Sequence, residues 1–260
     1  MTTSDGVVRL RGTRLGAGSP RVCVPLVATT PEAAAAAARA LPPGVADVVE
    51  LRLDHVTGSA GDPGLVRAAV AAVRAALPAD VPLLATFRSA REGGAQPADD
   101  AACARVVRTV VAGTPGADGA DAVDVELAAP DVADLVAHAQ AAGLAVVVSH
   151  HDFAATPSAD EIVAVLRRQR DAGADVCKIA VMPHDADDVL ALLSATRRFA
   201  RDADRPVVTV AMGPLGLVTR LAGGVFGSAM TFGSVGAVSA PGQVDAARLR
   251  DVLDLLHDAG

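Results

Sequence analysis

Short apolar runs alternate with alanine-rich segments of helical period along almost the whole chain. Runs of this length, bounded by Gly, Pro and Asp, are typical of strands that are buried on both faces. The runs lie at 22–28, 48–53, 82–87, 122–127, 145–149, 174–183, 207–211 and 229–232. The pattern therefore predicts eight strands.

Each predicted strand is followed by a predicted helix. Thr30, Pro31 and Glu32 supply an N-cap, a first-turn proline and an acidic first turn, and Gly143 ends a later helix. The helices are expected at 30–41, 62–77, 98–112, 130–142, 158–172, 215–222 and 244–258, and a long helix after the sixth strand is expected to end at 201. Eight such units in about 240 residues predict an α/β fold, a closed (β/α)8 TIM barrel. The competing fold is a doubly wound open sheet, but no glycine-rich fingerprint follows the first strand.

A short segment precedes the first main strand. Residues 7–11 predict a strand and 14–20 a turn-rich link, so residues 1–20 form an N-terminal extension that is expected to cap the barrel. Repeats and disordered tracts are absent from the sequence. We expect one domain over 1–260.

Composition narrows the function classes. The net charge is −7, and Trp and Tyr are absent, so a nucleic-acid partner is not expected. The first residues lack the features of a signal peptide. The uncharged stretch 221–244 contains six glycines and Pro241, which indicates loops and a short strand and not a membrane span. Three scattered cysteines show no metal spacing. We expect a cytoplasmic protein without a metal.

Lys178 is the only lysine among 23 basic residues. It lies in the apolar run 174–183, which predicts a buried strand. Arginine does not lose its proton in proteins, whereas a lysine in an apolar site can become a neutral amine. Such an amine forms Schiff bases with carbonyl substrates, which makes Lys178 the candidate nucleophile. The alternative is a structural lysine whose ammonium reaches the strand end or pairs with a carboxylate.

Charged and polar residues lie on one face of several predicted strands, near the C-terminal ends where barrel enzymes build their sites. Charge on a strand buried on both faces is costly unless it is paired or functional. A structural ion-pair network explains one such pair, but explains the whole converging set less well. The set is Glu50, Arg52, Asp54, Arg88, Asp124, Glu126, Ser149 and His151.

Two adjacent histidines end the fifth strand. Alternation from Ser149 turns His151 inward and His150 toward the helical layer. A histidine near neutrality both takes and gives a proton, so His151 is the candidate acid and base. The other four histidines are interpreted as surface or loop residues.

The loops after strands seven and eight carry candidate binding groups. Arg220 follows a glycine-containing turn and suits a substrate carboxylate, although a surface arginine or a phosphate site remains open. Ser239 and Gln243 supply a hydroxyl and an amide at the same rim, in what is otherwise an ordinary turn.

Taken together, these residues resemble the type I 3-dehydroquinate dehydratase family. The matching stretches, in chain order, are Glu50-Leu51-Arg52-Leu53-Asp54, 86–94, Asp124-Val125-Glu126, Ser149-His150-His151-Asp152-Phe153, 178–183, 212–220 and 239–243. None is decisive alone. Their order on an eight-strand pattern makes the resemblance specific.

The resemblance implies a dehydration of 3-dehydroquinate to 3-dehydroshikimate in the shikimate route, without metal or cofactor. Lys178 would form the imine at C3, and His151, oriented by Glu92, would move the protons. Arg220 would bind the substrate carboxylate. The remaining contacts implied for the substrate are Glu50, Arg52, Arg88, Ser239 and Gln243. A homodimer is the family expectation.

Two other functions remain open on the residues alone. A class I aldolase also carries a Schiff-base lysine on strand six of a barrel, and would bind phosphate in the glycine-rich stretch 223–233. A non-catalytic barrel that binds a small acid is the third, and would bind without turnover.

Overall fold

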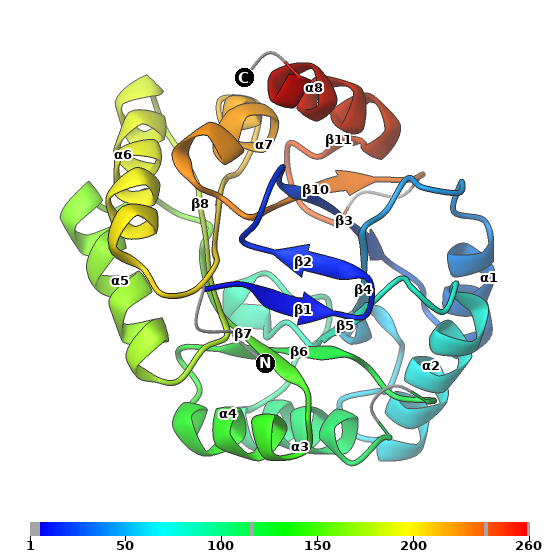
Figure 1. Ribbon diagram of the computed structural model, residues 1–260. Coiled ribbons are helices and arrows are strands. Elements are labelled where there is room, and N and C mark those ends of the chain that lie inside the picture. The colour runs from blue at the N-terminus through cyan, green and yellow to red at the C-terminus, as the bar shows by residue number, and fades with distance from the viewer. Residues whose placement is uncertain (1–5, 115–116, 237–238, 259–260) are drawn as a thin grey trace.

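Eight parallel strands form a ring that helices surround on the outside (Figure 1). The computed structural model describes residues 6–114, 117–236 and 239–258. The barrel strands are β3 (Arg21–Leu26), β4 (Val48–Arg52), β5 (Leu83–Thr86), β6 (Ala122–Glu126), β7 (Ala145–Asp152), β8 (Val176–Val181), β9 (Val207–Ala211) and β10 (Met230–Ser234). All eight predicted strands are therefore confirmed.

The pairing order shows that the sheet closes on itself. Neighbouring strands pair in parallel in the order β10-β3-β4-β5-β6-β7-β8-β9. A parallel bridge between Val207 and Ser228 joins the two ends of this order, and Ala229 N–H donates to the Val207 carbonyl at 2.7 Å. The predicted TIM barrel is confirmed, and the doubly wound sheet is excluded.

One α-helix follows each barrel strand before the next begins. The α-helices are α1 (Pro31–Arg39), α2 (Pro63–Ala76), α3 (Asp100–Val111), α4 (Val132–Ala141), α5 (Ala159–Asp171), α6 (Ala186–Asp202), α7 (Leu217–Ala222) and α8 (Ala246–Asp258), with short 3-10 turns η1 (Leu53–His55), η2 (Ala90–Glu92) and η3 (Gly223–Phe226). Side-chain caps fix several helix starts. Thr30 accepts from Ala33 N–H, and Ser158 and Glu161 form a capping box.

Three details differ from the sequence prediction. Residues 14 and 15, expected in a link, form β2 (Thr13–Leu15) together with Thr13, and this strand pairs antiparallel with β1 (Val8–Leu10). Strand β11 (Val244–Asp245) pairs with the end of β10, so the last helix begins two residues later than expected. Strand β7 continues three residues past the predicted end at Ser149. That extension carries both histidines into the sheet.

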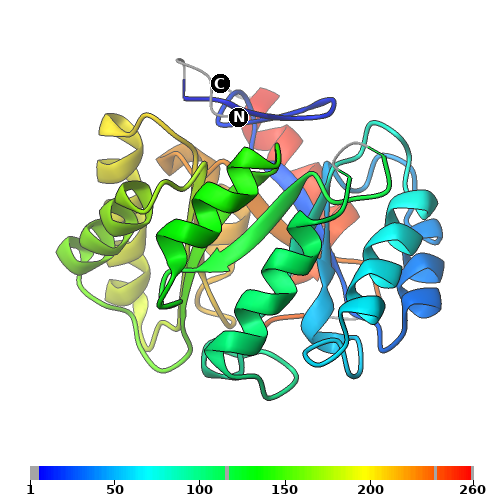
Figure 2. The same ribbon diagram turned by 90° about the horizontal axis from the view of Figure 1, so that it is seen from below.

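The hairpin β1–β2 covers the N-terminal end of the barrel, as the turned view shows (Figure 2). Val8, Leu10 and Leu15 are buried in one apolar cluster with inward-facing barrel residues. Arg11 donates to the Ala79 carbonyl at 2.7 Å and Thr13 to the Asp47 carbonyl at 3.0 Å, both just before barrel strands begin. Burial of apolar surface therefore holds the hairpin over the end opposite the strands' C-termini.

Aspartates clip neighbouring strands together at this same end. Asp47, Asp121 and Asp175 each immediately precede a strand, and each accepts a backbone N–H from the strand before it. The donors are Val22 at 2.7 Å, Leu83 at 2.8 Å and Val146 at 2.9 Å. Each carboxylate thus satisfies a backbone donor that the ladder leaves free.

In the described ranges, no helix combines the length and the apolar character that crossing a membrane requires. The uncharged stretch 221–244 forms the end of α7, the turn η3, strand β10 and the loop that follows it, of which residues 237 and 238 lie outside the description. The interpretation of this stretch as loops and a short strand is confirmed.

Candidate active site

Polar side chains from β4, β5, β7 and β8, and from the loops that follow the strands, meet in a cavity at the C-terminal end of the barrel. All nine predicted site residues line it: Glu50, Arg52, Arg88, Glu92, His151, Lys178, Arg220, Ser239 and Gln243. The structure therefore brings together residues that lie between Glu50 and Gln243 in the sequence, at the end of the barrel where enzymes of this fold build their sites.

Lys178 points into this cavity from the middle of β8. Its side chain is 5% exposed, and its Nζ lies 3.9 Å from Glu50 Oε1 and 3.9 Å from Asp124 Oδ2. The Phe232 ring centroid is 4.6 Å from Nζ. Carboxylates on β4 and β6 thus lie beside the amine, in keeping with the predicted convergence of charged residues at this end of the barrel. The amine faces the cavity, as a nucleophile must.

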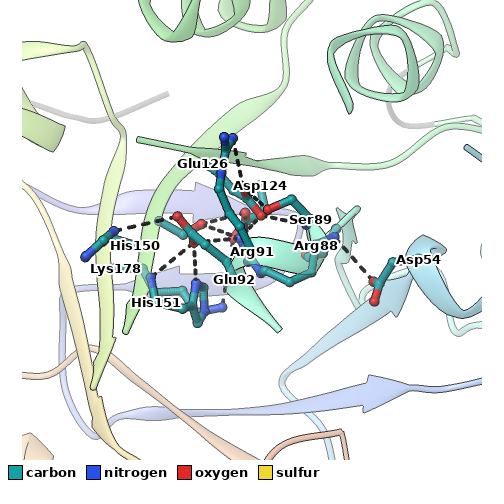
Figure 3. Close-up of polar contacts among 12 residues, drawn as sticks. Asp54, Arg88, Ser89, Arg91, Glu92, Asp124, Glu126, His150, His151 and Lys178 are labelled. Carbon is teal, nitrogen blue, oxygen red and sulfur yellow. Dashed lines mark hydrogen bonds and ion pairs between the residues drawn. The ribbon is translucent and has the colours of Figure 1, made fainter. Parts of the chain in front are cut away.

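His151 lies one strand away, on β7, and is held by Glu92. Its Nδ1 is 2.9 Å from Glu92 Oε2, and its backbone N–H donates to the same oxygen at 3.1 Å (Figure 3). Burial lowers the pKa of His151 well below its ordinary value, and the charges of Arg88 and Lys178 lower it further. With Glu92 ionised, Nδ1 donates and Nε2 is free to accept a proton.

The second histidine, His150, is absent from the cavity lining, in keeping with the alternation that turns only His151 inward, but it also contacts Glu92. His150 Nδ1 lies 3.6 Å from Glu92 Oε1, and its side chain is about one-third exposed (Figure 3). Glu92, on the neighbouring turn η2, reaches both histidines, a contact that alternation along β7 does not specify. Burial raises the pKa of Glu92, while the bond from His150 and the charge of Arg88 oppose that rise.

Arg88 is the centre of a buried ion network. Nη1 donates to Glu126 Oε1 at 3.1 Å and to Ser149 Oγ at 2.8 Å, and Nη2 donates to Asp124 Oδ1 at 2.9 Å. Burial alone lowers the pKa of Arg88, but the surrounding carboxylates raise it to well above its ordinary value. The guanidinium is a permanent cation that fixes three strands relative to one another.

Arg52 is held in a second buried pair. Its Nε and Nη2 donate to the two oxygens of Asp54 at 2.8 and 2.7 Å, a bidentate arrangement. Asp54 also accepts the Ala95 N–H at 3.0 Å. Burial raises the pKa of Asp54, but the bond and charge of Arg52 lower it to below its ordinary value. This pair fixes the turn that carries Glu92.

Two glycines let that turn fold. Gly93 has φ +86°, and a Cβ there would overlap the Phe153 ring. A Cβ on Gly94 would overlap the Arg88 carbonyl. Only glycine permits this close approach, which sets Glu92 beneath the histidines.

Arg220 contrasts with the other two arginines of the cavity. It is 2% exposed, and Nη2 donates to the Pro241 carbonyl at 3.0 Å. Its Nε is buried with no hydrogen-bond partner among the described residues, and no carboxylate of the described chain acts on its pKa. Burial lowers the pKa of Arg220 to about 10, so it remains a cation near pH 7. A buried cation without a counter-ion favours an anionic ligand.

The loop after β10 covers the cavity next to Arg220. Ser239 and Gln243 bond to each other, with Ser239 N–H donating to Gln243 Oε1 at 2.9 Å and Gln243 Nε2 donating to Ser239 Oγ at 3.0 Å. Gly213 N–H donates to the Pro241 carbonyl at 3.2 Å. A Cβ on Gly242, where φ is +76°, would overlap Gly213. The loop therefore rests on the turn after β9.

Several residues that shape the site were recognised as inward-facing but given no role. Asp124, Glu126 and Ser149 surround Arg88, and Asp54 pairs with Arg52. Thr86 donates to Glu50 Oε1 at 2.8 Å and was missed. Alternation along the strand could have identified the residues around Arg88, since Asp124 and Glu126 share one face of β6.

No group of three or more His, Cys, Asp and Glu side chains in the described ranges is arranged to hold a metal ion.

The geometry offers a primary amine, a neutral imidazole and an unpaired guanidinium around one cavity. An amine attacks a carbonyl carbon, an imidazole moves a proton, and a guanidinium binds a carboxylate. Together these groups suit an acid with a ketone that loses or gains a group after imine formation.

Comparisons with known proteins agree with this chemistry. The model of the family described as type I 3-dehydroquinase matches residues 22–259. A 3-dehydroquinate dehydratase of Listeria monocytogenes is 44% identical over 252 residues, covering 96% of this chain and 98% of the relative. One from Klebsiella pneumoniae is 44% identical over 242 residues, covering 92% and 94%.

A solved structure is similar over nearly the whole chain. The type I 3-dehydroquinate dehydratase of Clostridium difficile, described with covalently modified comenic acid, has a TM-score of 0.91 and 36% identity. The match covers 98% of this chain and 99% of that one.

Proposed function

The chain belongs to the type I 3-dehydroquinase family of hydro-lyases, and on that premise we propose that it dehydrates 3-dehydroquinate through a Schiff base on Lys178. The product is 3-dehydroshikimate, which places the reaction in the shikimate route to aromatic amino acids. The observation that carries the proposal is the lone lysine, whose Nζ shares one cavity with His151 and Arg220.

Lys178 acts first in this scheme. Its neutral amine attacks the C3 ketone, and loss of water leaves an iminium that acidifies the hydrogen on C2. His151 Nε2 then accepts that proton, and the C–H electron pair forms an enamine. The electrons of the enamine expel the C1 hydroxyl, to which His151 returns the proton, so that water leaves. Hydrolysis of the remaining iminium frees the product and Lys178.

The electrostatics of His151 support the base role. Burial and the neighbouring cations lower its pKa, so the ring is neutral and able to accept a proton near pH 7. Glu92 fixes the ring through Nδ1 and stabilises the imidazolium once it forms. One group thus serves as base and then as acid in one cycle.

Substrate binding is assigned by charge. Arg220, which lacks a carboxylate partner in the described structure, binds the substrate carboxylate. Glu50 and Arg52 contact the ring hydroxyls. Arg88 also contacts the ring hydroxyls. Its guanidinium has five N–H groups, of which three donate to protein oxygens, and the others remain for the substrate. Ser239 and Gln243 close over the carboxylate from the loop after β10.

The wider setting follows from the family in the same way. We propose a cytoplasmic homodimer that needs neither metal nor cofactor, because the iminium formed on Lys178 supplies the electron sink. The Clostridium difficile relative, described with covalently modified comenic acid, supports covalent chemistry in this fold.

An aldolase is less well supported by the cavity. The glycine-rich stretch 223–233, where an aldolase would bind phosphate, supplies only Phe232 to the lining within the described structure.

Turnover of two substrates tests the proposal. We expect 3-dehydroquinate to give the rising ultraviolet absorbance of a conjugated product, and a phosphorylated aldol to give no change. Turnover of the aldol alone would contradict the assignment. Ligand-induced stabilisation by dehydroquinate without turnover would indicate a binding protein instead.

A further inference from the structure

This inference rests on the proposed function and concerns the proton that Lys178 must lose before it attacks. Two carboxylate oxygens lie at the same distance from Nζ, Glu50 Oε1 and Asp124 Oδ2, each at 3.9 Å. They differ in what else they bind. Glu50 Oε1 already accepts the Thr86 hydroxyl at 2.8 Å.

Asp124 has one oxygen fixed and one free. Its Oδ1 accepts from Arg88 Nη2 at 2.9 Å and from Ser149 Oγ at 2.7 Å. Its Oδ2 is buried and has no hydrogen-bond partner within the described residues. A buried carboxylate oxygen without a partner is costly, and its nearest ion-pair contact is Lys178 Nζ. The network that fixes Oδ1 therefore aims Oδ2 at the nucleophile.

His151 must be a neutral base when the C2 hydrogen becomes acidic, which happens only after the imine has formed. An imidazolium has no free lone pair on Nε2. Asp124 already forms an ion-pair contact with Nζ, so a carboxylate that serves imine formation leaves His151 neutral throughout that step.

We propose that Asp124 is the acid and base of imine formation, while His151 serves only the steps that follow. Asp124 Oδ2 takes one proton from the Lys178 ammonium, and the resulting amine attacks the ketone carbon. A proton passes from that nitrogen to the alkoxide oxygen, which gives the carbinolamine. Asp124 then returns its proton to the hydroxyl, water leaves, and the iminium forms. Asp124 ends as the carboxylate it was at the start.

The separation allows this transfer after a small rotation. A charge-assisted N–H···O bond is about 2.8 Å, so Nζ has to approach Oδ2 by about 1 Å. The lysine stem has four rotatable bonds, whereas Asp124 Oδ1 is held by two donors. The nucleophile moves and the carboxylate stays.

The experiment measures imine formation alone. Variants are made in a His151→Ala background, where the step after the imine is blocked. The protein is mixed with saturating 3-dehydroquinate, quenched with borohydride at successive times, and the adduct at Lys178 is quantified by mass spectrometry. We expect Asp124→Asn to form the adduct on the order of 10²-fold more slowly.

Glu126→Gln is the matched control. It removes one negative charge from the same Arg88 network and the same strand, but from a residue without an ion-pair contact to Lys178. Its rate of imine formation is expected to stay within about threefold of the background. Loss of a nearby negative charge by itself favours a neutral amine. Slower imine formation in Asp124→Asn therefore reports the lost acceptor.

The pH dependence distinguishes an acceptor from a structural residue. In Asp124→Asn, hydroxide becomes the proton acceptor, so the deficit is expected to be smaller at about pH 9 than at about pH 7. An equal loss in Glu126→Gln, a pH-independent loss, or a larger loss in Glu50→Gln would overturn the assignment. So would failure of His151→Ala to form an adduct that the unmodified protein forms.

One outcome would contradict the proposed function and not only the role of Asp124. Absence of any Lys178 adduct in the unmodified protein would remove the Schiff base, whereas equal rates with and without Asp124 would remove only this inference. Should Asp124→Asn fail to fold, Ser149→Ala removes a donor that fixes Oδ1 and keeps the charge. A slower adduct rate is then expected, and an unchanged rate would contradict the proposal.

Discussion

At the N-terminal end of the barrel, aspartates join neighbouring strands through backbone N–H groups, whereas at the C-terminal end carboxylates surround a cavity and form ion pairs with the side chains that line it. The contrast is sharpest on β6. Asp121, just before this strand, accepts from Leu83 N–H, Arg74 and Arg11. Asp124, three residues further, leaves one oxygen without a partner in the described structure. The same residue type stabilises strand pairing at one end and stays available at the other.

Apolar packing follows the same division. The hairpin β1–β2 fills the N-terminal end with Val8, Leu10 and Leu15. At the other end the loop with Ser239 and Gln243 bonds mainly to itself and to the turn after β9. Apolar burial thus holds the hairpin at the closed end, whereas at the open end Asp124 Oδ2 and Arg220 Nε, at the cavity, lack hydrogen-bond partners in the described structure.

The largest effect is expected from Lys178→Ala. Loss of the nucleophile should lower kcat on the order of 10⁴-fold or more, because no other lysine exists to replace it. Steady-state assays with dehydroquinate measure the loss, and thermal unfolding checks that the fold is kept. Residual turnover within tenfold of the parent would place the covalent step elsewhere.

His151→Ala follows. Removal of the base should lower turnover on the order of 10²-fold or more, while the imine on Lys178 still forms. Intact mass after borohydride treatment reports the imine, and product absorbance reports turnover. Equal loss of both signals would argue that His151 is structural.

Arg220→Gln should act on binding. Loss of a charge-assisted contact to the substrate carboxylate costs about 1.5–3 kcal/mol, which raises KM about 10- to 100-fold with a smaller change in kcat. Arg198→Gln is the control, since Arg198 pairs with Asp160 on the exposed surface. An unchanged KM in Arg220→Gln would leave the buried cation without its proposed role.

The acid limb of kcat/KM should lie below pH 6.5. The folded-state pKa of His151 is lowered, so the base form persists as pH falls and is lost only below that lowered value. The pKa of Glu92 is raised by burial, and protonation of Glu92 also removes the acceptor for Nδ1, so the limb belongs to the pair. We expect kcat/KM to be nearly constant from about pH 6.5 to 8. A midpoint at or above 6.5 would contradict this account.

Asp121→Ala is expected to have the smallest effect on activity. It leaves the buried Leu83 N–H without its partner and removes the carboxylate beside the buried Arg74, which keeps its backbone carbonyl acceptors, and should lower the free energy of unfolding by about 2–4 kcal/mol. Thermal unfolding measures the loss. Since Asp121 lies at the closed end, kcat/KM should stay within about twofold. A large loss of kcat/KM in a folded variant would show that the two ends are coupled.

The barrel could be predicted from the sequence because strands buried on both faces leave apolar runs that local pattern reveals. The convergence of Glu50, Lys178 and His151 followed from the same alternation, since parallel strands bring their C-terminal ends together. The strand-pairing aspartates also left a signal, because Asp47, Asp121 and Asp175 each stand directly before a strand.

Other features depend on register and on loops, which alternation does not specify. The bond between Arg52 and Asp54 required the turn η1 to bend the chain after β4. The contact of His150 with Glu92 required β7 to continue to Asp152 and the glycines of the 88–94 turn to lie close. The carboxylates beside Lys178 required the relative heights of β4, β6 and β8.

The central claim is that Lys178 forms a covalent imine with the substrate. The chain has one lysine, so borohydride reduction in the presence of 3-dehydroquinate leaves only two primary amines to consider, Lys178 and the N-terminus. Peptide mapping by mass spectrometry should find the reduced adduct on Lys178. An adduct on the N-terminus only, or none while the protein turns over, would contradict the claim.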